Sequence, residues 1–185
     1  SERYKVLYIN FEEFSGLDEI LCARDDLTLS DALYYFRQGK QAAKDKILKT
    51  IQTVEGVDYI PPVMCAEDIS YIEPEEMAAF VECAGKGGHY ETVVLDLSSA
   101  LRQPWRLMEC FTSIFMPIKN DYLSERKIFE FETYFCSIGL TKVLGYIEKV
   151  RLPEGESGID TDFWNKIKIG GMYRFVKKIL EKNNI

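Results

Sequence analysis

TVVLDL, residues 92–97, is a run of β-branched and other apolar residues interrupted by a single acid, Asp96. Such a run favours a strand buried on both faces, which is the usual state of a strand in a parallel sheet. Similar runs predict further strands at 4–9, 57–61, 113–118 and 146–152. The spacing between these strands leaves room for helical crossovers, so a parallel arrangement is expected.

Segments with a helical spacing of apolar residues separate the predicted strands. Pro74, followed by two glutamates, suits the first turn of a helix that is expected to end at Gly85. Thr28 or Ser30 is expected to cap an earlier helix. The other helices are predicted at 29–36, 41–54, 105–110, 122–136, 163–169 and 172–182. The alternation predicts one α/β domain over residues 1–185, with a mostly parallel central sheet and helices on both faces.

Composition excludes several classes of function. The formal net charge of −7 disfavours direct nucleic-acid binding, because phosphate binding needs a basic face. The five cysteines include no C-x-x-C pair and there is one histidine, so free thiols are favoured over a disulfide framework or a zinc site. No run of about 20 apolar residues is present. We therefore expect a cytoplasmic protein without a membrane span.

Acidic and amide side chains follow two of the predicted strands. Asp96 follows the apolar residues 92–95 of the run above, and Asn10 and Glu12 follow the run at 6–9. In open α/β sheets, ligands bind at the carboxyl ends of the strands, where an aspartate can hold a water on Mg²⁺ beside phosphate. Two simpler interpretations stay open: Asp96 can cap the following turn, and Glu12 can be a solvated loop acid.

The order of these segments resembles that of the MinD/ParA ATPases, including their pilus-assembly relatives, over nearly the whole chain. The family opens its second strand with an apolar run ending in Asp-x-Asp, and a later Tyr-Asp-x-apolar-Asp segment forms its second switch. The segments that carry the resemblance are Val6–Glu12, Leu29–Leu33, Val57–Pro61, His89–Asp96 and Arg151–Pro153.

This resemblance implies a P-loop NTPase-like fold that uses ATP and Mg²⁺. Asp96 would hold Mg²⁺ through water, and Glu12 would position the attacking water, so these two residues are the implied catalytic pair. Asn10 and Pro153 would lie beside the nucleotide. Asn10 and Glu12 stand where the family has aspartates, which means that Asn10 cannot serve as a base and that the Glu12 carboxylate reaches further.

The phosphate-binding loop of the family, G-x-x-x-x-G-K-[ST], is absent from the 185 residues. Its backbone N–H groups cradle phosphate, and the strand that leads into it lies beside the strand of the second switch. Gly85-Lys86-Gly87-Gly88 is the nearest imitation and is predicted to be a flexible turn. The chain is therefore predicted to be the C-terminal part of a longer protein, unless the fold closes the gap in another way. Taken alone, it is predicted to be inactive.

Two classes of function remain. The first is an ATP-dependent switch that forms a homodimer and recruits a protein partner, with the phosphate-binding loop supplied by upstream sequence. The alternative is a non-catalytic α/β interaction domain that keeps the fold without binding nucleotide. A receiver-like signalling domain fits the spacing of the acids poorly. We interpret the helix at 172–182 as packed on the sheet, without membrane association, and His89 as a loop residue.

Overall fold

The computed structural model describes residues 4–17, 20, 27–99, 101–153 and 170–183, and the chain divides into two compact units. The first unit is Ser1–Cys110 and the second is Phe111–Ile185. The predicted fold class, α/β with a mostly parallel sheet, is confirmed. That all 185 residues form one domain stays a prediction.

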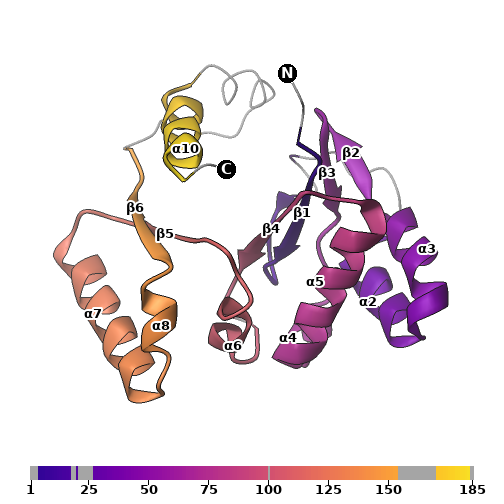
Figure 1. The fold of residues 1–185 in the computed structure, drawn as a ribbon, viewed down its shortest axis with the longest axis horizontal. Coiled ribbons are helices and arrows are strands. Elements are labelled where there is room, and N and C mark those ends of the chain that lie inside the picture. Colours follow the sequence, from indigo (N-terminus) through magenta and orange to yellow (C-terminus); the bar gives the residue numbers. More distant parts are fainter. Residues whose placement is uncertain (1–3, 18–19, 21–26, 100, 154–169, 184–185) are drawn as a thin grey trace. The chain divides into compact units, whose positions relative to one another are not determined.

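The first unit contains a four-stranded sheet in the order β2-β3-β1-β4 (Figure 1). β1 (Val6–Phe11) is parallel to both β3 (Val57–Ile60) and β4 (Thr92–Leu97). Three side chains on one face of β1, Leu7, Ile9 and Phe11, are completely buried. This burial is expected for the central strand of a sheet that is covered on that face.

Three helices pack against one another in the first unit: α2 (Leu29–Arg37), α3 (Lys40–Thr50) and α5 (Pro74–Gly88) (Figure 1). Of the two predicted caps, Thr28 and Ser30, the structure has Thr28, whose backbone N–H donates to the Asp31 carboxylate at 2.9 Å. The short helices α4 (Glu67–Ser70) and α6 (Pro104–Met108) complete the unit.

The prediction of a helix over 41–54 is wrong at its C-terminal end. Gln52–Val54 is a strand, β2, and it pairs antiparallel with β3. The connection consists of Glu55 and Gly56, which both have positive φ, 51° and 85°. A two-residue turn of this kind matches the twist of paired strands and makes a hairpin. The pairing with β3 thus overrides the helical spacing of the preceding residues.

The prediction of a flexible turn at Gly85–Gly88 is also wrong, because these residues form the last turn of α5. The glycines are needed for close packing. A Cβ on Gly85 would lie 3.0 Å from Val93 Cγ2 of β4, and one on Gly87 would lie 3.3 Å from Lys44 Cγ of α3. Gly88 is the last residue of the helix. The next residue, His89, caps it with a left-handed φ of 55°.

Replacing Gly88 with alanine should lower the free energy of unfolding by about 1–3 kcal/mol, the usual cost of overpacking. The new Cβ would lie 2.1 Å from Tyr90 Cε2. That ring is held in place, since its hydroxyl donates to Asp58 at 2.8 Å and Lys5 Nζ lies 4.6 Å from its centroid. The gain in helix propensity, at most about 1 kcal/mol, is smaller.

Urea denaturation of the Gly88→Ala variant measures this cost. Gly171→Ala is a suitable control, because Gly171 is the first residue of a helix and a Cβ there meets nothing within 4 Å. We expect the control to leave stability unchanged or slightly raised. Equal stability of the two variants would contradict the close approach of α5 to Tyr90.

The second unit contains β5 (Ile114–Ile118) and β6 (Ile147–Arg151), which pair in parallel. The helices α7 (Tyr122–Ser137) and α8 (Thr141–Leu144) connect them, and α10 (Gly171–Lys182) follows. The Lys182 side chain of α10 forms an ion pair with Glu148 of β6 at 2.7 Å. The predicted loop at 155–158 and the predicted helix at 163–169 lie outside the described residues.

The described strands form two sheets, whereas the sequence predicts one. β4 pairs with β1 alone and β5 pairs with β6 alone, so in the described part of the chain each has one edge without a strand partner. Strands belong to one sheet only if each is hydrogen-bonded to its neighbour. No described strand is hydrogen-bonded to both β4 and β5, so the two sheets stay separate in the described part of the chain. Among the described helices, none is long and apolar enough to cross a membrane.

Candidate functional site

The carboxyl ends of β1 and β4 lie side by side and bring three of the predicted site residues to one end of the sheet. In the parallel register, Asn10 is the partner of Asp96 and Phe11 is the partner of Leu97. Glu12 is the first residue after β1. Asn10 is 1% exposed, whereas Asp96 is exposed to solvent. The strand pairing therefore brings together Asn10, Glu12 and Asp96.

A tyrosine that the sequence analysis did not select connects these residues. The Tyr8 hydroxyl donates to Asp96 Oδ2 at 3.2 Å and accepts a hydrogen bond from Asn10 Nδ2 at 3.3 Å. Burial, followed by the negative charge of Asp96, raises the pKa of the Tyr8 hydroxyl above its usual range. The hydroxyl is therefore protonated at neutral pH and can serve as a donor.

The orientation of the Asn10 amide follows from its backbone neighbour. The Glu12 backbone N–H donates to Asn10 Oδ1 at 2.6 Å, and an N–H can bond only to the oxygen end of an amide. Asn10 Nδ2 therefore faces the Tyr8 hydroxyl and, at 3.5 Å, Glu12 Oε2. The buried side chain thus presents donors to the other members of the cluster.

Ser98 joins the loops that follow the two strands. Its hydroxyl lies within hydrogen-bond distance of the Phe11 carbonyl oxygen, at 3.1 Å, and of Glu13 Oε2, at 2.8 Å. The pKa of Glu13 lies below its usual value, because its own backbone N–H and then the Ser98 hydroxyl donate to the carboxylate. Ser98 thus restrains the loop that carries Glu12 from the β4 side.

These side chains, as they are arranged, do not fit Mg²⁺. A magnesium ion needs oxygen lone pairs directed at it from several sides. Here, Asp96 Oδ2 accepts from Tyr8, and the group that faces Glu12 Oε2 is an N–H donor of Asn10. No cluster of three or more histidine, cysteine, aspartate or glutamate side chains that could hold a metal occurs in the described part of the chain.

No protein-family model matches the sequence, and no curated protein matches it either. Solved structures, in contrast, share its fold. A ParA family ATPase from Chlorobium tepidum is 19% identical with a TM-score of 0.64, and the match covers 90% of this chain and 68% of that one. The chain has the fold of the ParA/MinD ATPases.

Two further structures with the ParA/MinD fold show similar agreement. The MinC:MinD cell division protein complex of Aquifex aeolicus gives a TM-score of 0.54 at 16% identity, over 96% of this chain and 64% of that one. A plasmid partition protein from Borrelia burgdorferi gives 0.56 at 14% identity, over 91% and 74%. The chain thus spans roughly two thirds to three quarters of the length of these proteins.

The pairing of β1 with β4 brings Asn10, Glu12 and Asp96 together, but the shared fold does not assign their roles. The catalytic roles of Glu12 and Asp96, and the metal role of Asp96, stay predictions. Pro153 follows β6 in the second unit and is exposed, and its proposed contact with nucleotide also stays a prediction.

The sequence contains a signal that would have identified Tyr8. In a strand, alternate residues lie on the same face. Tyr8, Asn10 and Glu12 are polar residues at every second position, which indicates a polar face at the end of β1. The interpretation of 4–9 as apolar on both faces concealed this alternation. No comparable signal links Ser98 with Glu13, because their contact depends on strand pairing.

Proposed function

We propose that this chain is the larger part of a nucleotide-dependent switch of the ParA/MinD type, in which a segment outside the 185 residues supplies the phosphate-binding loop. The observation that supports this proposal is the edge of β4. Among the described strands only β1 pairs with β4, so no described strand pairs with the other edge of β4. In this proposal, the strand that leads into the phosphate-binding loop pairs with this edge, as the resemblance implies.

The burial of β4 supports the same proposal. Leu7, Ile9 and Phe11 of β1 are completely buried, but the β4 residues in register with them, Val93, Leu95 and Leu97, are only half-buried. On the opposite face, Val94 is 45% exposed. Half-buried apolar residues at an unpaired edge are a site for another strand, because pairing would bury them and complete the ladder.

In this proposal the ligand is ATP with Mg²⁺, and bound nucleotide controls a homodimer and the recruitment of a protein partner. Phosphate carries several negative charges, and binding it takes a row of backbone N–H donors and a lysine. The cluster of Glu12 and Asp96 is acidic and repels phosphate. The 185 residues alone should therefore bind Mg-ATP very weakly and hydrolyse none.

Calorimetry with Mg-ATP on the 185-residue chain and on its full-length parent tests the proposal. We expect binding and slow hydrolysis only for the parent, and Asp96→Ala in the parent should abolish hydrolysis. The proposal would be overturned by a parent without a glycine-rich phosphate loop. Micromolar binding by the 185-residue chain, or a loop-containing parent that ignores ATP, would overturn it equally.

The second candidate function is a non-catalytic interaction domain, and a specific observation favours it. Tyr8 and Asn10 already provide a donor to one oxygen of Asp96 and one oxygen of Glu12 without a ligand. If the parent binds no nucleotide but the 185 residues fold as described, this second function is the one to retain.

A further inference from the structure

The outer face of α7 leaves apolar side chains in contact with solvent. Among the apolar residues of this helix only Phe135 is buried. Glu132 marks the side of α7 that faces the sheet of the second unit, because it forms an ion pair with Lys149 of β6. Leu123 lies about two and a half turns before Glu132 and Tyr134 about half a turn after it, so both lie on the opposite side. These two residues are 63% and 44% exposed, so the outer face is not purely polar.

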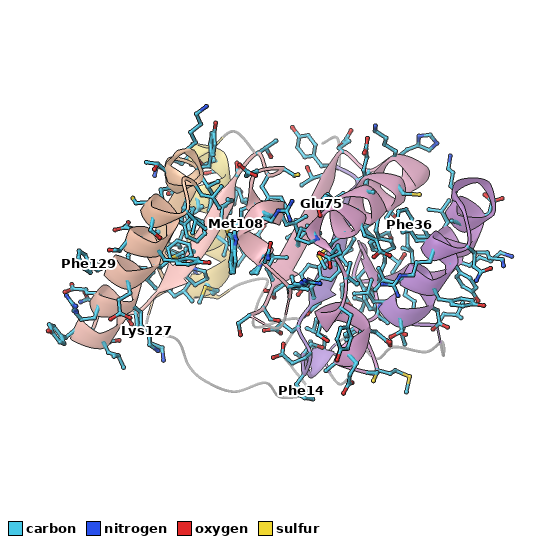
Figure 2. All side chains as sticks on the ribbon, turned by 90° about the horizontal axis from the view of Figure 1, so that it is seen from below. Phe14, Phe36, Glu75, Met108, Lys127 and Phe129 are labelled. Atoms are coloured by element: carbon cyan, nitrogen blue, oxygen red, sulfur yellow. The ribbon has the colours of Figure 1, made fainter. Side chains whose placement is uncertain are left out.

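Four exposed residues form a seam along this outer face: Leu123, Lys127, Glu130 and Tyr134. They are separated by four, three and four positions, the spacing at which the side chains of one helix line up to meet a second helix. Figure 2 shows Lys127 extending away from the ribbon. Neither Lys127 nor Glu130 forms an ion pair with any residue that the structure describes. The middle of the seam thus carries one positive and one negative charge without a described partner.

The order of the residues in the seam is complementary to itself when a second copy runs in the opposite direction. If Lys127 of one copy lies beside Glu130 of the other, the two-fold axis repeats this ion pair. The same register brings Leu123 beside Tyr134 of the second copy, since each lies four positions outward from a charged residue of the seam. In a parallel pair Lys127 would meet its own copy, so the charges select the antiparallel direction.

We propose that α7 is a homodimer surface, on which the α7 of a second copy of this chain packs antiparallel without nucleotide. The inference goes beyond the proposed function and does not depend on it, because the seam lies in the second unit, whereas Asn10, Glu12 and Asp96 lie in the first. A helix of 16 residues is about 24 Å long, so one helix pair is a small interface beside the usual area of about 800 Å² per partner. We therefore expect a weak dimer that forms at protein concentrations of about 0.1–1 mM.

Charge reversal tests this pairing, with the self-association of the 185-residue chain measured by sedimentation equilibrium in the absence of nucleotide. We expect Lys127→Glu to raise the dissociation constant of the dimer about tenfold or more, because two contacts between like charges replace two ion pairs. Glu130→Lys should have the same effect for the same reason. Combining both substitutions in one chain should restore the dimer. A mixture of the two single variants should form the heterodimer in preference to either homodimer, since opposite charges then meet at both positions.

Glu125→Lys is the matched control. It changes the net charge as Glu130→Lys does, on the same helix, but Glu125 lies about 140° around the helix from Glu130. This control should self-associate like the unmodified chain, and circular dichroism confirms that each variant keeps its helix content. An unmodified chain that stays monomeric at about 1 mM would overturn the inference. A double variant as weak as the single ones, or an equal effect of Glu125→Lys, would overturn it too. Because no nucleotide is used, the outcome is separate from a failure of the parent to bind ATP.

Discussion

Replacing Phe80 with alanine should lower the free energy of unfolding by about 3–5 kcal/mol, the range for a large aromatic residue removed from a core. Phe80 lies on α5 and is completely buried. Its ring meets that of Phe36 on α2 edge to face, with 5.7 Å between the ring centroids. The substitution removes this contact and leaves a cavity between two helices. The expected loss is a large fraction of the total stability of a domain, about 5–15 kcal/mol.

Phe14→Ala provides the control for this prediction. Phe14 lies in the loop after β1, is 88% exposed, and points away from the ribbon in Figure 2. Its replacement removes the same number of atoms but creates no cavity, so we expect a change within about 0.5 kcal/mol. Urea denaturation followed by circular dichroism compares the two variants. If Phe80→Ala cost no more than Phe14→Ala, the packing of α5 against α2 would be wrong.

The sequence predicted the elements whose boundaries are set locally. β4 occupies the predicted residues 92–97, because an apolar run between polar residues defines both of its ends. The starts of α2 and α5 follow from Thr28 and Pro74, whose caps need only neighbouring residues. Asn10 and Asp96 were expected at one end of the sheet, since the carboxyl ends of parallel strands meet there.

The features that the sequence did not predict depend on residues far apart in the chain. The glycines at 85–88 look like helix breakers until the approach of Val93 and Tyr90 is known. Gln52–Val54 becomes a strand because β3 is available to pair with it. The Tyr8 hydroxyl acquires its role only when β4 brings Asp96 within reach. In each case the tertiary partner, and not the local propensity, decides the outcome.

Replacing Asn10 with aspartate, the residue that the resemblance expects at this position, should destabilise the protein by about 3 kcal/mol at neutral pH. An uncompensated charge in a buried position costs roughly this amount. Asn10 is 1% exposed, so a new carboxylate there would be poorly solvated. It could still accept from the Glu12 N–H, but it would lose the donor that Asn10 directs at the Tyr8 hydroxyl. It would also stand beside the carboxylates of Asp96 and Glu12.

The pH dependence separates this charge effect from a simple loss of hydrogen bonds. Burial and two nearby acids raise the pKa of a carboxyl group at position 10 above its value in the unfolded chain. Folding then favours the protonated form, so the destabilisation of Asn10→Asp should shrink as the pH falls towards the unfolded pKa, near about 4. Asn10→Ala loses the same amide donors without gaining a charge. Its cost, about 1–3 kcal/mol for leaving the Glu12 N–H unsatisfied, should depend little on pH.

Urea denaturation of the unmodified chain, Asn10→Asp and Asn10→Ala at pH 5 and pH 8 provides the comparison. We expect Asn10→Asp to be less stable than Asn10→Ala at pH 8 and the difference between them to narrow at pH 5. The reason is that the new buried carboxyl group takes up a proton as the pH falls from 8 to 5, whereas alanine has no group to protonate. If Asn10→Asp were as stable as the unmodified chain at pH 8, the donors of Asn10 would not be what stabilises this cluster, and the chain would tolerate three acids at the end of β1 and β4.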